Sequence, residues 1–371
     1  MTAYVFMMVF WLAGYYFLIY QSQDKELPSD KIEKKKKAYV FFAGILLFLV
    51  MGLRHKYVGI DTMRYLERYR VSGKLDWNFF LDTSQWIKQE MGFTLVGKIL
   101  HTLGVGNQMY LVLYALFISV CISRFVYQWC RNYFLGFYLH ATIGLFTMSM
   151  SGIRQSIACC ICWFAVEDIL KKKPIRFVLL VLLAATFHQS AIFFLAFYFV
   201  RYLKLSKVSG WLVWFFCLML VFLRPVLITI LTFLMPVKYD IYGMISDKHP
   251  VNPALVWIAL LIPMFCLFFW ERKKMVSKED EQLYSMCFFG SFLYAIITTL
   301  SLSSNMIGRM SQYYYIFNVV LLGNIVSEIE DYKTRYIVFL FTLLLPGYMF
   351  FKSQSLGISP YYFFWQTYGS P

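Results

Sequence analysis

The chain has 371 residues, of which 60% are hydrophobic, 20% aromatic and only 15% charged, and its mean hydropathy is +0.60. This composition excludes an ordinary soluble domain and predicts an all-α polytopic membrane protein, with residues 1–371 as one integral membrane domain. The formal net charge is +15. Because the cations are dispersed between apolar runs, they indicate loops that orient membrane spans and not a nucleic-acid surface.

Apolar runs of about 15–20 residues, which can cross a bilayer as helices, recur along the chain. The first has no leading basic region and no small-residue cleavage site, so we expect a retained span and not a signal peptide. In chain order, the predicted spans are 4–20, 38–53, 109–127, 134–150, 153–170, 174–203, 211–223, 254–270, 283–302, 312–326 and 336–351.

The run at 174–203 is too long for one passage, and Phe187-His188-Gln189-Ser190 interrupts it. It forms either one tilted helix or a hairpin of two short helices with His188 near the tip. Counting two helices places the basic loops on one face, which the positive-inside rule favours. These loops lie at 34–37, 131, 171–173, 201–207, 272–278 and 333–335. The total is then about twelve transmembrane helices, with the N-terminus and the aromatic C-terminal tail outside.

Two longer connections are predicted outside, at residues 54–107, after the second span, and at 224–253. We expect interfacial or re-entrant helices in the first. Its Gly59-Ile60-Asp61-Thr62 sequence predicts a turn and a helix start, with Asp61 or Thr62 as the N-cap. Arg64, Tyr65 and Arg68 would then share a helix face with Asp61.

Arginines at span ends on this outer face indicate an anion site. Arg54, Arg154 and Arg309 are the main candidates, because isolated arginines need either the interface or a wet cavity holding an anion. Arg154 also opens a predicted helix, whose dipole and free N–H groups would add to its charge and suit a phosphate or pyrophosphate. A guanidinium offers a fork of donors that matches phosphate oxygens.

Two residues are candidates for a general base, Asp61 and His188. A histidine between apolar halves needs a partner, and it serves either as a hydrogen-bonded structural residue or as a base. The five histidines show no paired metal-ligand spacing, and Cys159-Cys160-Ile161-Cys162 has no matching second pair, so we expect no metal and no cofactor.

Four short motifs resemble the EpsG family, a Wzy-like group of bacterial membrane proteins in exopolysaccharide and capsule synthesis. They are Arg54–Thr62 with Tyr65 and Tyr69, Gly152–Ala158, Ala185–Ala191, and Arg309 before Tyr313-Tyr314-Tyr315. The resemblance implies a polysaccharide polymerase of glycosyltransferase-C-like architecture in the bacterial cytoplasmic membrane. Such an enzyme joins oligosaccharide repeat units carried on undecaprenyl pyrophosphate at the outer face, leaving undecaprenyl pyrophosphate from the growing chain.

Under this hypothesis Arg54, Arg154 and Arg309 bind the pyrophosphate, His55 and Tyr65 contact substrate, and Asp61 or His188 deprotonates the acceptor hydroxyl in an inverting displacement. Membrane lipid and other assembly proteins, such as a flippase or a chain-length regulator, are the expected partners, and nucleic acid is not. A flippase or transporter of the same lipid-linked sugar, a glycan ligase and a membrane acyltransferase stay open as alternatives. A transporter would be favoured by an internal repeat, and none is visible.

Overall fold

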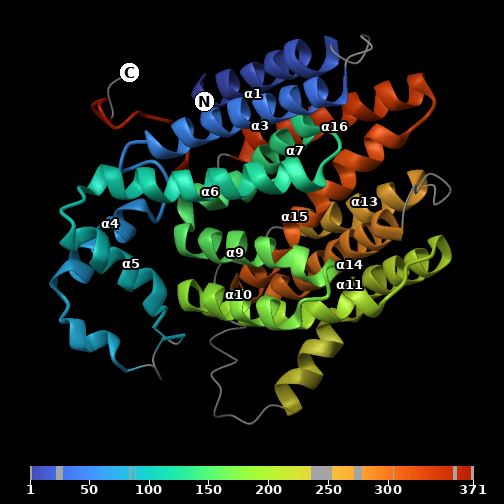
Figure 1. Ribbon diagram of the computed structural model, residues 1–371. Coiled ribbons are helices and arrows are strands. Elements are labelled where there is room, and N and C mark those ends of the chain that lie inside the picture. The colour runs from blue at the N-terminus through green and yellow to red at the C-terminus, as the bar shows by residue number, and fades with distance from the viewer. Residues whose placement is uncertain are drawn as a thin grey trace.

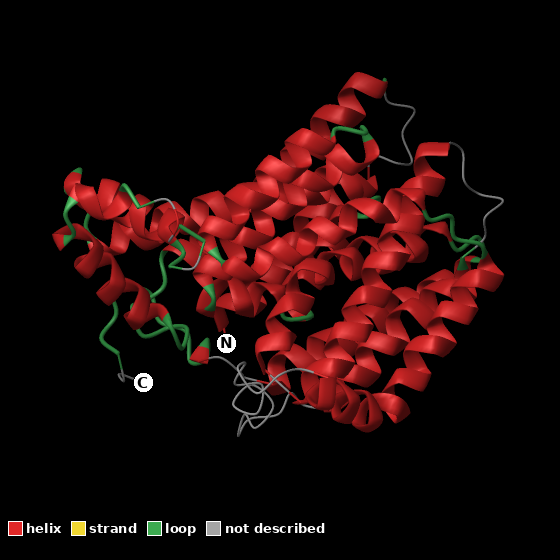
Figure 2. Ribbon diagram, turned by 90° about the horizontal axis from the view of Figure 1, so that it is seen from below, coloured by secondary structure: helices red, strands yellow, loops and turns green. Residues whose placement is uncertain are grey.

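The computed structural model describes residues 2–21, 28–82, 84, 86–87, 89–234, 253–270, 278–303, 305–353 and 357–368. These residues form helices and loops, and no β-strand is found among them (Figure 2). The α-helices are α1 (Thr2–Tyr15), α3 (Ser29–Gly52), α4 (Thr62–Lys74), α5 (Met91–Thr102), α6 (Asn107–Trp129), α7 (Tyr133–Thr142), α8 (Leu145–Ser151), α9 (Ile153–Leu170), α10 (Pro174–Phe187), α11 (Lys207–Leu234), α13 (Pro253–Phe269), α14 (Lys278–Leu300), α15 (Asn305–Glu328) and α16 (Tyr332–Ser353). The remaining helices are the π-helix η1 (Tyr16–Tyr20) and the 3-10 helices η2 (Trp77–Phe80), η4 (Gln189–Tyr202) and η6 (Ser301–Ser303).

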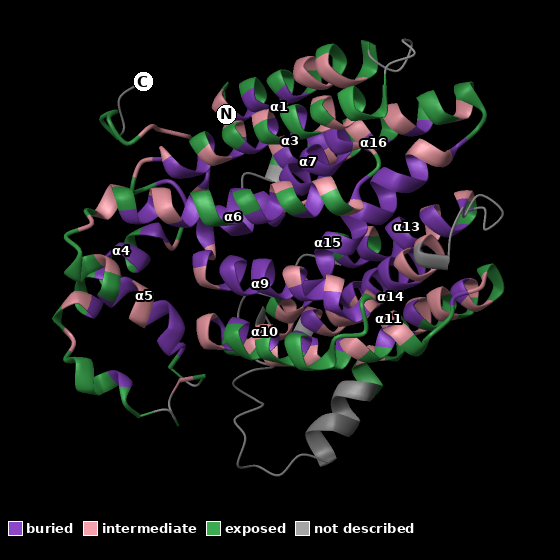
Figure 3. Cartoon of the chain, viewed as in Figure 1, coloured by how far each residue is buried: buried purple, intermediate pink, exposed green. Residues whose placement is uncertain are grey.

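The long helices lie in two groups, and α4 and α5 lie at one end of the bundle (Figure 1). One group contains α1, α3, α6, α7 and α16, and the other contains α9, α10, α11, α13, α14 and α15. Helices α9 and α15 are the most central, with buried residues on nearly all sides (Figure 3). A helix that is buried all round needs an apolar sequence all round. Helix α9 is polar only near its ends, and the buried Asn318 in the middle of α15 accepts a hydrogen bond from the Ser291 hydroxyl at 2.6 Å.

The outer helices expose large apolar side chains that a soluble protein would hide. Phe10 and Phe17 near the N-terminus, Phe216 on α11 and Phe341 on α16 are each more than half exposed. Continuous apolar surface of this kind is typical of a face that contacts lipid. The chain is therefore a multi-pass, all-helical membrane protein.

The predicted count of about twelve spans is not confirmed. Within the described residues, five helices are long and apolar enough to cross a membrane, or six if the bent pair α7 and α8 counts as one span. Helices lie in all the predicted apolar segments, but several fail the test for physical reasons. Helix α9 carries three charged residues, Arg154, Glu167 and Asp168, and α10 is too short to span alone.

The segment 174–203 forms the hairpin that the basic loops predicted. The rings of Phe177 and Phe194 lie with their centroids 6.0 Å apart, whereas 17 residues of straight helix would separate them by about 25 Å. His188 has an extended backbone between α10 and η4. The chain therefore reverses at His188, which sits at the tip.

Residues 54–107, which were predicted to lie outside, contain α4, η2 and α5, and α6 begins at the end of this segment. Gly59 turns the chain into α4 with φ of +94°, and a Cβ there would lie 2.5 Å from the Met150 carbonyl oxygen, so only glycine fits. The first part of the second predicted external segment, 224–253, is helical, because α11 continues through Pro225 to Leu234. Residues 235–252 of that prediction lie outside the described part of the chain.

The opposite end of the bundle is held by ion pairs between basic loops and helix termini. Arg131 pairs with Glu328 at 2.6 Å and with Asp280 at 3.5 Å, and Arg124 pairs with Glu167 at 2.8 Å. These pairs join the end of α6 to the ends of α9 and α15 and to the start of α14. The predicted cytoplasmic cations therefore gather at the end away from α4 and α5.

Candidate functional site

The candidate site is built around the start of α9. The chain leaves α8 at Ser151, Gly152 breaks the helix, and α9 begins at Ile153, where the predicted span 153–170 starts. Arg154 therefore occupies the first turn of a long helix, where free N–H groups favour negative charge. Its guanidinium pairs with Glu90 and lies 5.8 Å from the centre of the Tyr65 ring.

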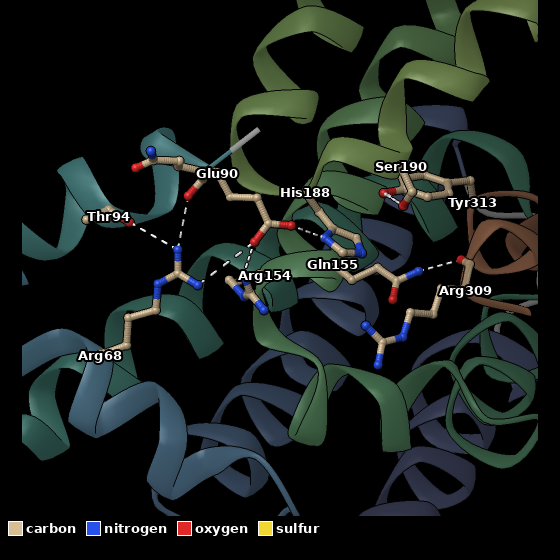
Figure 4. Close-up of polar contacts among 10 residues, drawn as sticks. Arg68, Glu90, Thr94, Arg154, Gln155, His188, Ser190, Arg309 and Tyr313 are labelled. Carbon is tan, nitrogen blue, oxygen red and sulfur yellow. Dashed lines mark hydrogen bonds and ion pairs between the residues drawn. The ribbon is translucent and has the colours of Figure 1, made fainter. Parts of the chain in front are cut away.

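Glu90 is the residue that connects the parts of this site. Its buried carboxylate contacts the guanidinium of Arg154 through Oε2 and the ring Nδ1 of His188 through Oε1. Arg68 lies 4.0 Å from the same Oε2 and donates to the Gln89 carbonyl at 3.1 Å and the Thr94 hydroxyl at 3.3 Å. Figure 4 shows Arg68, Arg154 and His188 pointing at one carboxylate from three segments.

Local backbone geometry brings Glu90 to this position. It adopts the left-handed conformation, with φ of +52°, directly before α5. Two residues later, Gly92 lies so close to α10 that a Cβ would be 2.2 Å from the Thr186 hydroxyl and 2.9 Å from the Thr186 Cβ. This contact holds the start of α5 against the end of α10, which is the segment that leads to His188.

His188 itself is held at the tip of the hairpin. Its carbonyl accepts a bond from the Ala191 N–H at 2.9 Å, and the Ser190 hydroxyl lies 3.1 Å from the Tyr313 hydroxyl of α15. The ring is mostly buried, and its Nε2 has no hydrogen-bond partner among the described residues. One ring nitrogen is therefore engaged by a carboxylate and the other is unpaired.

Arg309 approaches the site from α15. The Gln155 side-chain amide donates to the Arg309 carbonyl, which fastens the start of α15 to the start of α9. The Arg309 side chain is exposed, and Figure 4 shows it on the other side of His188 from Glu90. The structure thus brings together Arg154, His188 and Arg309, which are far apart in the sequence.

The site carries more positive than negative charge. Arg68 and Arg154 face the carboxylate of Glu90, and Arg309 adds a third guanidinium on the other side of His188. Burial and, after it, the neighbouring Arg154 cation lower the pKa of Arg68, and burial raises the pKa of Tyr65. An anion would relieve the repulsion between these guanidinium groups.

Arg54 and His55 lie in a different setting, where the C-terminal tail covers the end of α3. The buried Arg54 donates to the carbonyls of Met51 and Met150, the latter at 3.4 Å. The His55 ring stacks on Tyr368 with centroids 5.7 Å apart, and burial followed by the Lys56 charge lowers the pKa of His55. Both residues join the tail to the bundle, and neither contacts the Glu90 cluster in the described structure.

Asp61 occupies the N-cap position of α4, as one of the two predicted options, but its side chain makes no capping bond. It pairs with Arg64 at 3.3 Å on an exposed surface. The Thr62 hydroxyl donates to the Val58 carbonyl at 2.7 Å. The predicted common face of α4 exists, but only Tyr65 and Arg68 of that face meet Arg154 or Glu90.

Sequence reasoning missed Glu90 and placed Arg68 on the common face of α4 without assigning it a role in the site. The available signal was an isolated carboxylate directly before the weakly apolar run 92–103. Within the described residues no group of three or more histidine, cysteine, aspartate or glutamate side chains could hold a metal ion.

The family model described as the EpsG family matches residues 37–367. The chain belongs to the EpsG family. The match runs from α3 to the aromatic tail and includes every residue of the site, so the resemblance read from the short motifs is confirmed. No curated protein and no solved structure matches the chain. For this EpsG-family protein, membership points to a role in exopolysaccharide assembly.

Proposed function

We propose that this EpsG-family protein is a polysaccharide polymerase that joins undecaprenyl-pyrophosphate-linked oligosaccharide repeat units at the outer face of the bacterial cytoplasmic membrane. One observation carries the proposal: Arg154, Arg68 and His188, from three distant segments, converge on Glu90 at one end of the helical bundle. The guanidinium groups and the imidazole at this end, beside lipid-facing helices, suit a transfer from a lipid phosphate carrier, which needs an anion site and a base.

The pyrophosphate binds to the arginines in this proposal. Arg154 combines its planar fork of donors with the N-terminus of α9, and the exposed Arg309 supplies a second guanidinium. Arg68 adds a third positive charge on the side of α4. Arg54 is given a scaffold role instead, because its guanidinium is already used by two carbonyls.

The proposed reaction is an inverting displacement at the anomeric carbon of the donor. A hydroxyl oxygen of the acceptor repeat unit forms the new glycosidic bond, and its proton passes to the base, His188 or Asp61. The bond from the anomeric carbon to the pyrophosphate oxygen breaks, and its electron pair leaves with undecaprenyl pyrophosphate. The arginines stabilise the charge that develops on this leaving group.

The polarity of the bundle supports the orientation. Basic loops and their ion pairs gather at the end away from the site, and the positive-inside rule assigns that end to the cytoplasm. The N-terminus and the site then face outside, where a flippase would deliver repeat units and a chain-length regulator would act on the product.

The test is a reaction of the purified protein in nanodiscs with one lipid-linked repeat unit. A ladder of products supports a polymerase, whereas a single transfer indicates a ligase, acylation an acyltransferase, and no covalent change a transporter. We expect Arg154→Ala and His188→Ala to abolish the ladder while the protein still inserts normally, and Asp61→Asn compares the two candidate bases. Unchanged polymer length and yield in both Arg154→Ala and His188→Ala would refute the assignment.

A further inference from the structure

The carboxylate of Glu90 divides its two oxygens between two tasks. Oε1 meets Nδ1 of His188, and Oε2 meets the guanidinium of Arg154 with Arg68 beyond it. An ionised carboxylate can only accept hydrogen bonds, so the contact with His188 requires a proton on Nδ1. In a neutral imidazole the lone pair then lies on Nε2.

We infer that Glu90 is a positioning residue that makes His188, and not Asp61, the general base of the proposed polymerisation. This inference rests on the proposed function. Glu90 acts through His188: it fixes the tautomer and the ring orientation, and it stabilises the imidazolium that forms when Nε2 takes the proton of the acceptor hydroxyl. A histidine oriented by a carboxylate is a recurring arrangement for proton abstraction from a hydroxyl.

The unpaired Nε2 supports this assignment. A buried nitrogen acceptor is unfavourable without a hydrogen-bond partner, and within the described residues nothing bonds to this one. A hydroxyl of the acceptor sugar, placed between His188 and Arg309, would donate a hydrogen bond to this nitrogen. Asp61 offers no comparable arrangement, because it is only half-buried and is already paired with the exposed Arg64 at 3.3 Å.

The double task of Glu90 gives its substitution a distinctive kinetic signature. Glu90→Gln keeps the shape of the side chain, but its amide can donate to Nδ1 and so favour the tautomer with a proton on Nε2. Replacing the orienting carboxylate of a catalytic triad by its amide costs about 10⁴ in kcat. We expect kcat to fall by about 10²–10⁴-fold.

Binding should respond in the opposite way. Glu90→Gln removes the negative charge that faces Arg68 and Arg154, so KM should not rise and binding of undecaprenyl pyrophosphate should be unchanged or tighter. Arg154→Ala should instead weaken that binding. A merely structural role for Glu90 would weaken binding and thermal stability together. Glu67→Gln on the exposed side of α4 is the matched control for the charge change, and it should leave both quantities unchanged.

A double-mutant cycle tests whether Glu90 acts through His188. If it does, Glu90→Gln combined with His188→Ala is no slower than His188→Ala alone. If Glu90→Gln lowers the residual rate of His188→Ala by the same factor as in the wild type, the inference is overturned.

A spectroscopic measurement separates the inference from the proposed function. In protein labelled with ¹⁵N-histidine, the signal missing from His188→Ala identifies His188, and its shifts report which nitrogen carries the proton. We expect the Nδ1–H tautomer in the wild type and the Nε2–H tautomer in Glu90→Gln. The same tautomer in both would overturn the inference whatever the protein polymerises, whereas a wild type that shows the expected tautomer but makes no polymer would refute only the proposed function.

Discussion

The contact between Gly92 and Thr186 makes the position of Glu90 sensitive to a single methyl group. In Gly92→Ala the new Cβ would lie 2.2 Å from the Thr186 Oγ1, 2.9 Å from its Cβ and 3.1 Å from its carbonyl oxygen. Rotation of the hydroxyl removes the first clash but also breaks its 2.7 Å bond to the Leu183 carbonyl. The Cβ contact stays, and because optimal carbon contacts are about 3.5–4.0 Å, α5 must move by about 1 Å.

That movement should reach the chemistry. Overpacking of this kind costs about 1–3 kcal/mol of stability, and a misplacement of about 1 Å can lower a catalysed rate about 10²-fold. We therefore expect Gly92→Ala to insert and fold but to polymerise about 10²-fold more slowly in nanodiscs. Gly106→Ala is the matched control in the same segment, 54–107, because a Cβ there meets nothing within 4 Å. Wild-type turnover by Gly92→Ala would refute the reasoning that this contact holds Glu90 against His188.

Two further predictions concern the scaffold and the orientation. Arg54→Ala should lower the stability of the fold by about 1–3 kcal/mol for each carbonyl left unsatisfied. The folded variant should still bind undecaprenyl pyrophosphate. A selective loss of that binding, like the loss expected for Arg154→Ala, would contradict the scaffold role. In intact cells an impermeant maleimide should label Ile60→Cys, which the proposal places outside, and not Lys172→Cys, which it places in the cytoplasm. Both positions are exposed and all eight native cysteines are buried, so the label reports the side of the membrane. The reverse pattern would contradict the proposed orientation.

Much of the fold could be predicted because the membrane imposes simple rules on the sequence. Apolar length located the helices, including the start of α9 at residue 153. The basic loops favoured a reversal at His188, which hydropathy alone left undecided. The number of spans could not be predicted in this way, because a helical segment does not always meet the requirements for crossing a bilayer. Helix α9 carries charged side chains, and α10 is too short.

The site was harder to predict because its residues are far apart in the sequence, which does not indicate which side chains pair with one another. Arg54 and Arg154 look alike in the sequence, since each is an arginine at the end of an apolar run. The structure separates them by their partners: Arg54 is enclosed by two carbonyls of the scaffold, and Arg154 faces a carboxylate. Glu90 follows no helix period and matches no motif, so its meeting with His188, 98 residues later, needed the tertiary structure.

Glu90 also shows why an anion site can be built from residues that would otherwise repel. Arg68 and Arg154 each exert a field that opposes the charge of the other, and one carboxylate offsets only part of it. The fold retains that excess because Gly92 and the hairpin tip hold α5, α9 and α10 together. A bound pyrophosphate would neutralise the remaining charge, while Glu90 would still keep the Nδ1 proton of His188 in place. The Glu90 carboxylate therefore opposes anion binding but promotes proton transfer, and Glu90→Gln should change the two in opposite directions.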